Sequence, residues 1–326
     1  MRIACALVTF NRVELLKGAL AAASTQTRMP DRIFIINNAS TDGTRDYLDS
    51  LGNPRITPIH TSTNLGGAGG FRLAVDLAVA NDFDAVFLFD DDGIPENRAL
   101  EVLEAALVES DLALANSLVL SQTDPAQLAF GLIKETPGYQ GPSLFLVADA
   151  ESEARDGLLL DMANPFNGTL VRCTVARAIG PMRSEMFLWG DEVEFVRRLI
   201  RRGHRVATVI AARHHHPEPK TTIVQTRFGA TRVPSKGREV YFYRNRTFNA
   251  CRHFGLRHGF KDMIKTALCN MARGAVADGF MTLVWGFDGM FDLYVMKPSR
   301  GTLYAAWQAE FKSALSHCKM SAESRC

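Results

Sequence analysis

Residues 85–93 read Ala-Val-Phe-Leu-Phe-Asp-Asp-Asp-Gly, an apolar run that ends in three consecutive carboxylates. The apolar part has the length and composition of a buried β-strand, and Gly93 suits a turn after it. Adjacent acids raise each other's pKa unless a cation or strong donors neutralise them. Oxygen ligands suit Mn²⁺ or Mg²⁺, so the run predicts a divalent metal site. The alternative is that the acids cap the next helix, but one cap would account for only one acid.

The chain before this run alternates between short β-rich segments and segments with helical spacing. Strands are predicted at residues 3–10, 32–37, 55–60 and 85–89, and helices at 14–23, 41–51 and 71–80. This order is typical of βα units that build a Rossmann-like, mostly parallel sheet flanked by helices, an α/β fold. A polar loop follows every predicted strand, and in such a sheet these loops line the ligand crevice.

Two of these loops carry further candidate ligand-binding groups. Asn38 follows the second strand, where its amide could pair with a base edge, while an Asx turn or helix cap explains Ser40 or Asp42 equally well. Residues 64–70 read Asn-Leu-Gly-Gly-Ala-Gly-Gly, which lets backbone N–H groups approach a ligand closely. This stretch is neither a dinucleotide fingerprint nor a Walker A motif, and by itself it is better read as a flexible turn.

The second half is less regular at first and then helical. A helix is predicted at residues 99–108, a loop-rich insertion at 121–157, and a helix at 191–202 that ends at Gly203. A strand at 205–210 precedes the run His214-His215-His216, which we expect in a polar loop unless one histidine binds metal. From about residue 241 the pattern is mostly helical.

Composition and charge narrow the class of protein. The net charge of +2 by itself argues for no polyanionic partner, and we expect no nucleic acid. Fifteen Lys or Arg residues lie between Arg197 and Arg257 against two Glu, which suits either a solvated helix face or a surface that meets phosphates or anionic lipid. Six scattered cysteines without a CxxC pair indicate reduced thiols in a cytoplasmic protein.

Together the motifs resemble glycosyltransferase family 2, which has the GT-A fold. The resemblance rests on Thr9-Phe10-Asn11-Arg12, on the loops at residues 37–44 and 64–70, and on Asp90-Asp91-Asp92-Gly93. It is nearest to bacterial galactofuranosyltransferases, with rhamnosyltransferases next. It implies an inverting transfer of a sugar from a nucleotide diphosphate, most simply galactofuranose from UDP-galactofuranose. Asn38 stands where many members have Asp, so the identity of the base is open.

The resemblance also implies roles for residues. A nucleotide-sugar donor would be bound by Thr9, Asn11, Arg12, Asn38, Asn64, Gly66, Gly67, Arg72, Asp90 and Asp91. Asp90 and Asp92 would hold the metal together with His216 or His215. Glu192 would be the general base, with Asp191 as the second choice.

Sugar or acceptor contacts are implied for Asn167, Trp189 and Arg244. A core role is open for two of them, because Trp189 could be a buried aromatic and Arg244 could pair with a core carboxylate. The acids near Asp191 could likewise stabilise the start of a helix.

The expected organisation is a GT-A domain at residues 1–250, divided into a nucleotide-sugar half (1–95) and an acceptor and catalytic half (96–250), followed by a helical region at 251–326. Three aspartates interrupt the most membrane-like stretch, at 275–296, so a spanning helix is not expected. The basic segment and the C-terminal aromatics, Phe280, Trp285, Phe287, Phe291, Tyr294 and Trp307, instead favour a lipid-linked glycan acceptor and peripheral contact with the cytoplasmic face of the inner membrane.

Two other classes are weighed against this one. A nucleotidyltransferase also places carboxylates and a metal beside a nucleotide, but it would show a Gly-rich loop directly after the first strand, where this chain has Thr9 to Arg12. A non-catalytic sugar-nucleotide binder would not need the Asp191-Glu192 pair. Both are ranked below the glycosyltransferase.

Overall fold

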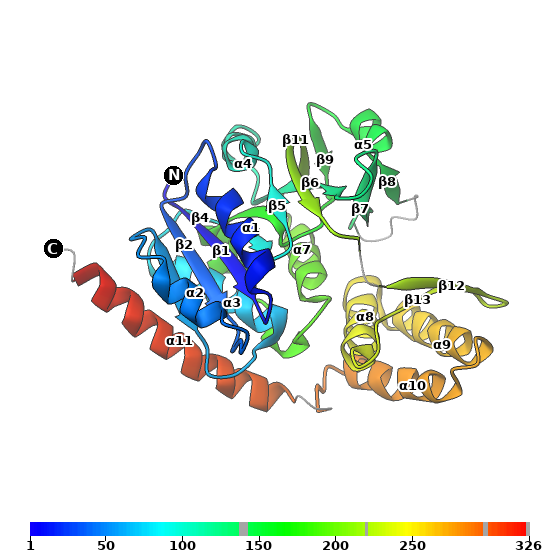
Figure 1. Cartoon of the computed structure of the whole chain (residues 1–326). Helices are drawn as coiled ribbons and strands as arrows, with labels where there is room; N and C mark the ends of the chain where they lie inside the picture. Colours follow the sequence, from blue (N-terminus) through cyan, green and yellow to red (C-terminus); the bar gives the residue numbers. More distant parts are fainter. Residues whose placement is uncertain (137–142, 219–220, 296–298, 324–326) are drawn as a thin grey trace.

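The computed structural model describes residues 1–136, 143–218, 221–295 and 299–323, and it consists of a sheet covered by helices with a separate helical group beside it (Figure 1). In the described residues the main sheet has eleven strands. Its central path is, in order across the sheet, β3 (Ile56–His60), β2 (Arg32–Asn37), β1 (Ile3–Thr9), β4 (Ala85–Asp90), β10 (Asn167–Arg172), β6 (Leu114–Ser121), β11 (Val206–His216) and β5 (Ile94–Pro95).

The first half of the sheet is parallel, as the sequence predicts. β1 pairs in parallel with β2 and β4, and β2 with β3. The helices that connect or follow these strands are α1 (Val13–Ser24), α2 (Thr44–Ser50), α3 (Gly66–Ala80) and α4 (Ala99–Glu109). Alternate residues of β1 face opposite layers: Ile3 packs with α1 and α4, whereas Ala4 packs with α3. The α/β prediction is confirmed.

Strand directions bring the key loops to one edge of the sheet. β10 runs antiparallel to both β4 and β6, so β6 runs in the same direction as β4. β11 is parallel to β6. The carboxyl ends of β1, β4 and β11 therefore meet at the same edge, which brings Thr9, Asp90 and His216 towards one another.

The histidine run lies in a strand, so its prediction as a loop was wrong. β11 extends to His216 because its last residues find two partners: β6 on one side, and on the other β5, which pairs His215 with Ile94. Side chains in a strand alternate between faces, so His214 and His216 share one face and His215 has the other.

The insertion at residues 121–157 is also more ordered than predicted. Its described part forms β7 (Gln127–Leu132), β8 (Leu144–Leu146) and α5 (Val147–Glu153), and β9 (Leu158–Leu160) follows; residues 137–142 lie outside the described ones. These elements enclose a small hydrophobic cluster of their own that includes Leu128, Leu132 and Ala150. Leucines in this segment thus supply a local core that the Pro and Gly content obscured.

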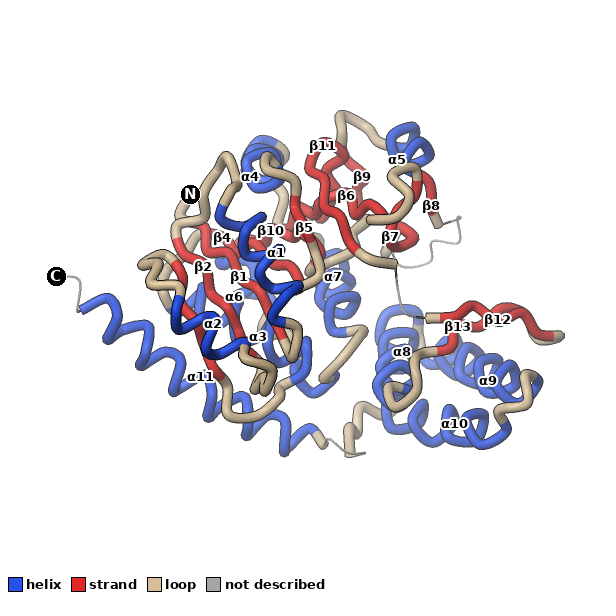
Figure 2. Tube along the Cα trace, in the orientation of Figure 1, coloured by secondary structure: helices blue, strands red, loops and turns tan. Residues whose placement is uncertain are grey.

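Three more elements complete the sheet-covered body: α6 (Cys173–Ile179), the 3₁₀ helix η1 (Ser184–Met186) and α7 (Asp191–Arg201). Beside them lies a separate group made of α8 (Glu239–Phe254), α9 (Leu256–Ala272) and α10 (Val276–Met290). The hairpin of β12 (Thr222–Thr226) and β13 (Gly229–Val233) precedes α8 in the chain and belongs to this group. The helical character predicted from residue 241 onward is confirmed. Figure 2 shows these three helices packed together away from the strands of the main sheet.

The last helix, α11 (Arg300–Glu323), leaves this group and runs back along the sheet-covered body (Figure 1). It is fixed there by Trp307, whose ring lies 3.7 Å from the guanidinium of Arg72, and by Glu310, which accepts hydrogen bonds from Ser62. Among the described residues no helix is both long and apolar enough to cross a membrane.

Glycines allow close packing in the helical group. A Cβ at Gly289 of α10 would lie 2.1 Å from the backbone oxygen of Arg244 in α8. We therefore expect Gly289→Ala to lower the free energy of unfolding by about 1–3 kcal/mol, since neither backbone can yield without moving its helix. Urea unfolding followed by circular dichroism measures this.

Gly301 provides the matched control, because no atom lies within 4 Å of a Cβ placed there. Gly301→Ala in α11 should leave stability unchanged or raise it slightly, since alanine favours a helix. Equal effects of the two substitutions would contradict the close-packing argument.

Candidate active site

The acidic loop at the end of β4 is the centre of the site. Residues Ala85 to Phe89 are completely buried, and the chain then turns back, with the N–H of Gly93 donating to the carbonyl oxygen of Asp90 over 3.3 Å. A Cβ at Gly93 would lie 2.3 Å from Nε2 of His214, so a side chain cannot be accommodated there. The turn therefore places the three aspartates at the edge of the sheet where the strands end, while β5 returns to pair with β11.

Three of the predicted metal ligands come together. One ligand atom from each of Asp90, Asp92 and His216 lies within 4.8 Å of the others. Nε2 of His216 is 3.1 Å from a carboxylate oxygen of Asp92, and Nδ1 contacts the carbonyl oxygen of Pro217 at 2.6 Å. A backbone acceptor at Nδ1 leaves Nε2 to bind a cation, which is the usual second contact of a metal-binding histidine. The group therefore fits a divalent ion with oxygen and nitrogen ligands.

The electrostatics of this group are those expected of a cation site. Burial, together with the charges of Asp92 and Asp91, raises the pKa of Asp90 to about 8. Burial alone would lower the pKa of His216, but the hydrogen bond to Asp92, the charges of Asp92 and Asp90 and the contact with Pro217 together outweigh this and raise it. Without a metal, protons thus neutralise part of the negative charge that a metal would neutralise.

His215 is separated from this group by the strand geometry. It lies on the opposite face of β11, where Nε2 is 3.1 Å from a carboxylate oxygen of Glu96. Of the two histidines predicted as ligands, the structure therefore brings only His216 to the aspartates.

Asp91 points inward and has protein partners. It accepts a hydrogen bond of 2.8 Å from the hydroxyl of Thr9 and one of 3.0 Å from Nη1 of Arg12. Arg12 also reaches Asp92 at 2.9 Å. Thr9 and Arg12, predicted as donor-binding residues, thus meet the acidic loop, and Arg12 supplies one positive charge shared between two aspartates.

The other predicted donor-binding amides hold loops in place. The side-chain oxygen of Asn11 accepts from the N–H of Thr41, and that of Asn64 from the N–H of Gly66. Asn38 is buried, and its amide bonds to the backbone of Leu65 and Gly66 at 2.7 and 2.9 Å. These bonds fix the loops around the crevice, and they use the amide that we expected to contact a base.

The glycine-rich stretch is the first turn of a helix, so its interpretation as a flexible turn was wrong. α3 begins at Gly66, which has φ +71°, and a Cβ there would lie 2.1 Å from the carbonyl oxygen of Phe187. The N–H of Ala68 donates to that same oxygen over 3.2 Å. A Cβ at Gly70 would lie 2.6 Å from Cγ1 of Val8 in β1. The glycines serve close backbone packing, and Gly67 stands among them in this first turn.

Two predicted ligand-binding arginines are buried structural groups. Arg72 donates to the hydroxyl of Ser184 at 3.0 Å and stacks on Trp307, so its helix has turned it away from the acidic loop. Arg244 is completely buried, 3.9 Å from a carboxylate oxygen of Asp288 and with its guanidinium 4.3 Å from the ring of Tyr294. For Arg244 the structure supports the alternative of a core ion pair.

The predicted general bases begin α7. Asp191 is buried, and its pKa is raised well above the usual value by that burial, by contact with Glu192 and by the charge of Asp90. Glu192 is only half-buried, whereas Glu194 is buried and paired with Arg198 at 2.9 Å. The influence of Asp90 on Asp191 shows that the start of α7 adjoins the metal-binding group.

Two asparagines that the sequence did not single out position this helix. The amide of Asn245 in α8 donates to the carbonyl oxygens of Met186, Leu188 and Trp189, at 2.9, 3.0 and 2.7 Å. Asn249, one turn later, donates to that of Gly190 at 2.8 Å. The segment before α7 is therefore anchored to the helical group. The only signal for these asparagines in the sequence is that Asn249 lies four residues after Asn245, which ends the run Tyr241-Phe242-Tyr243-Arg244-Asn245.

Trp189 and Asn167 lie at the borders of the site. Trp189 is half-buried with φ +60°, next to the acids of α7, and its ring meets Phe242 edge to face at 5.9 Å. Asn167 pairs with Phe89 at the end of β4, and its amide nitrogen contacts the carbonyl oxygen of Pro165 at 3.1 Å.

A buried histidine behind the acidic loop was also not singled out. His214 is completely buried, and neither ring nitrogen has a hydrogen-bond partner among the described residues. Its ring lies against Gly93, against Gly168 and against the hydroxyl of Ser117, which is itself without a partner among those residues. Burial holds the pKa of His214 well below its usual value, so the ring is neutral.

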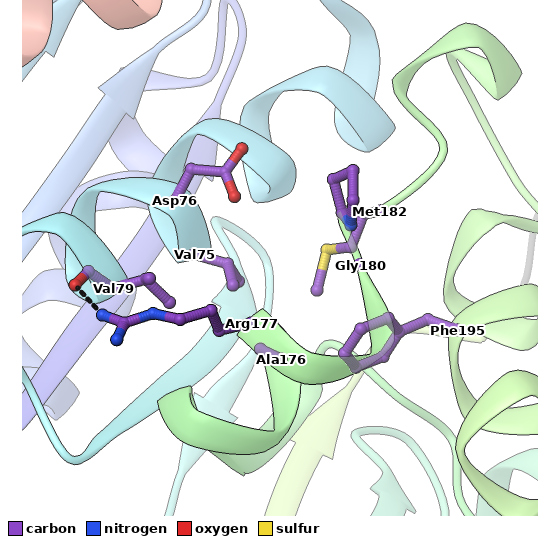
Figure 3. A pocket seen from close by; sticks show the side chains of 9 residues that line it. Val75, Asp76, Val79, Ala176, Arg177, Gly180, Met182 and Phe195 are labelled. Carbon is purple, nitrogen blue, oxygen red and sulfur yellow. Dashed lines mark hydrogen bonds between the residues drawn. The ribbon is translucent and has the colours of Figure 1, made fainter. Parts of the chain in front are cut away.

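A separate cavity of about 170 Å³ lies between α3 and α6 (Figure 3). It is lined mainly by apolar groups such as Val75, Met182 and Phe195, with Asp76 at its border. Burial raises the pKa of Asp76 to about 6, against the opposing effect of Arg72. None of the metal-binding group lines this cavity, so the candidate site is the crevice at the strand ends.

Comparison with known proteins agrees with this geometry. The family model for glycosyl transferase family 2 matches residues 5–124. The galactofuranosyltransferase GlfT1 of Mycobacterium tuberculosis is 34% identical over 247 residues, which is 74% of this chain and 80% of that protein. GlfT1 of Mycolicibacterium smegmatis is 33% identical over 251 residues, 76% of this chain and 82% of that protein.

A solved structure supports the fold. The crystal structure of GalNAc-T7 with UDP, GalNAc and Mn²⁺, a GT-A glycosyltransferase, superposes with a TM-score of 0.53 at 11% identity. The match covers 67% of this chain and 44% of the longer neighbour, and at this identity it bears on the fold alone. Since a third of the aligned residues are identical to those of the curated relatives over about four fifths of the relatives' length, this chain belongs to glycosyltransferase family 2 and is a galactofuranosyltransferase-like glycosyltransferase.

Proposed function

We propose that this enzyme transfers galactofuranose from UDP-galactofuranose to a hydroxyl of a growing cell-surface glycan, with inversion and with help from Mn²⁺ or Mg²⁺. The observation that carries the proposal is the convergence of Asp90, Asp92 and His216 beside the acids of α7, in a chain whose curated relatives are galactofuranosyltransferases. Family membership already argues against the nucleotidyltransferase and the non-catalytic binder.

The proposed mechanism gives each group one task. Asp90, Asp92 and His216 would hold the metal, whose positive charge would stabilise the departing diphosphate. Glu192 would accept the proton of the acceptor hydroxyl while that oxygen attacks the anomeric carbon from the face opposite the diphosphate. The new glycosidic bond forms as the bond to the diphosphate breaks, which inverts the anomeric configuration. Glu192 is preferred to the buried Asp191 because an acceptor can reach it more easily.

Donor identity is tested by binding. We expect UDP-galactofuranose with Mn²⁺ to raise the melting temperature more than dTDP-rhamnose does, because a ligand that binds only the folded state stabilises it. Radiolabel transfer to an acceptor glycan should follow the same order. Stabilisation by dTDP-rhamnose alone would instead favour the rhamnosyltransferase.

The two neighbouring histidines allow a matched test of the metal site. We expect His216→Ala to weaken Mn²⁺ binding by about 100-fold or more and to abolish transfer, because it removes one ligand. His215→Ala should retain both, since that ring lies on the other face of β11 against Glu96. Isothermal titration with Mn²⁺ measures the first effect. Equal Mn²⁺ affinities of the two variants would exclude His216 as a ligand.

The general base is tested with isosteric amides. We expect Glu192→Gln to lower kcat by about 10²- to 10⁴-fold while donor and Mn²⁺ affinities stay within about twofold of the original values, because the amide cannot accept the proton. If Asp191→Asn shows this pattern and Glu192→Gln does not, Asp191 is the base. Steady-state kinetics combined with donor titration distinguishes the cases.

Stability of the metal-free protein should depend on pH in a defined direction. The pKa of Asp90 is raised from 3.8 to about 8 in the folded state, so between these values the folded state retains a proton that the unfolded state has lost. Stability therefore falls as pH rises towards about 8, by at most about 1.4 kcal/mol per pH unit for one proton. The raised pKa of His216 acts in the same direction.

Urea unfolding at about pH 7 and about pH 8.5 measures how the free energy of unfolding changes with pH. These values lie above the range in which the buried neutral histidines would titrate once the chain is unfolded. Asp90→Asn should flatten the slope. Mn²⁺ should stabilise the original protein more at the higher pH, since the metal binds deprotonated ligands. A slope that is unchanged by Asp90→Asn would contradict the assignment.

A further inference from the structure

The outer face of α10 is apolar throughout. Every exposed residue of this helix is Val, Ala or Phe. The larger ones recur at helical spacing and continue just past its end: Val276, Phe280, Val284, Phe287 and Phe291. Phe280 and Phe291 are 61% and 60% exposed. The opposite face, with Gly279, Gly286 and Gly289, packs on α8 and α9, so the stripe faces away from the protein. Such a run of exposed aromatic side chains marks an interaction surface.

α9 extends this surface and adds charge to its border. Met263 and Met271 of α9 pack against the glycines of α10. Around α9, the next row of side chains is Phe260, Ile264 and Leu268, and the row after that is Arg257, Lys261 and Lys265. By helical geometry, the row that begins at Phe260 and the stripe of α10 lie on the same side of the helix pair, opposite α8. The surface is thus apolar with a basic rim.

The charges on this surface are unbalanced in a way that suits an anionic partner. In α9 and α10, Asp262 pairs with Arg246 at 2.7 Å, Asp278 with Arg273 at 2.8 Å, and Asp288 lies buried beside Arg244. In contrast, the exposed side chains of Arg257, Lys261 and Lys265 form no ion pair within 4 Å among the described residues, although the charge of Lys265 acts on Asp262. The positive charge of the rim is therefore available.

We propose that the outer face of α9 and α10 docks on the surface of an anionic lipid bilayer, with the phenylalanines among the acyl chains and the basic row at the headgroups. A protein partner would be expected to form about one hydrogen bond per 100–200 Å² of interface, but the α10 stripe offers no side-chain donor or acceptor. A bilayer needs none from the apolar face and favours Lys and Arg at its border. Figure 1 shows α10 along the outer edge of the helical group.

The surface is connected to the chemistry through α8. The asparagines of α8 hold the segment before α7, and α10 packs on that same helix. Docking would thus present the acids of α7 at a fixed height above the bilayer. The consequence that the acceptor is lipid-linked rests on the proposed function, whereas the docking itself does not require sugar transfer.

The test measures sedimentation of the full-length protein with vesicles of phosphatidylcholine, with and without phosphatidylglycerol. We expect binding mainly to the anionic vesicles, weakened at high salt. The triple variant Phe280→Ser, Phe287→Ser and Phe291→Ser should bind at least about tenfold more weakly. Leu15→Ser with Val108→Ser, at exposed positions on α1 and α4, is the matched control and should bind as the original protein does.

The charge contribution has its own control. Arg257→Gln, Lys261→Gln and Lys265→Gln together should weaken binding to anionic vesicles, by about fivefold per charge, and reduce the effect of salt. The same charge change at the exposed Arg45, Arg55 and Arg205 should have a much smaller effect. Sedimentation with vesicles that is equal for the original protein and both triple variants would overturn the proposal.

A second copy of the chain is the competing occupant. Analytical ultracentrifugation at low and high protein concentration detects it without lipid. A dimer that the phenylalanine variant abolishes, together with absent vesicle binding, would assign the face to self-association and overturn the membrane proposal. Loss of vesicle binding with normal transfer to a soluble acceptor would support the docking surface and leave the proposed function intact.

Discussion

Repulsion among the carboxylates at the end of β4 is the constraint on which the site depends. Asp90, Asp91 and Asp92 leave a fully buried strand together, and Asp191 approaches them from α7. Burial and mutual charge raise the pKa values of Asp90, Asp91 and Asp191, so a compensating positive charge is needed to keep these groups ionised. Arg12 supplies one positive charge, and His216 marks where a second cation belongs. In the proposed mechanism the same cation would also neutralise the nucleotide diphosphate, so the structural and catalytic requirements would coincide.

The second half of the site is held from outside the sheet. The side-chain amides of Asn245 and Asn249 donate hydrogen bonds to four backbone carbonyl oxygens in the segment before α7. Phe187 in that segment contacts the first turn of α3. The helical group thus supports the acids at the start of α7, which are the proposed general bases. Buried hydrogen bonds of this kind hold a backbone segment in one conformation, because a buried carbonyl left without its partner would lower the stability of the folded protein.

Much of the fold could be predicted, because its strongest signals are local. The apolar run at residues 85–89, the alternation of strands and helices, and the acids at the start of α7 all depend on near neighbours in the chain. The Asp90 and Asp92 part of the site followed from the same local pattern. The domain boundaries at residues 95 and 250 remain predictions, although α8 already begins at Glu239.

The remaining features depended on distant partners. Histidines at 214–216 become a strand only because β5 and β6 flank them, and the choice of His216 over His215 depends on which face of β11 meets the acids. Arg72 and Arg244 were predicted to bind ligands because an arginine in a polar motif suits an anionic ligand. The aromatic rings that cover them, Trp307 and Tyr294, come from distant parts of the chain and could not be predicted from the motif. The side-chain amide of Asn38 likewise could pair with a nucleotide base, but it already forms hydrogen bonds with the backbone of Leu65 and Gly66.

The irregularity in β11 has an evolutionary consequence. Pairing with β6 breaks between Val209 and Arg213, so the strand has two separately registered parts, one in the hydrophobic core and one carrying His216. In an unbroken strand, a gain or loss of one residue would turn every later side chain over and exchange His215 for His216 at the acids. The bulge can absorb such a change locally. Insertions and deletions there can therefore accumulate in descendants of this chain while the same histidine keeps facing the aspartates.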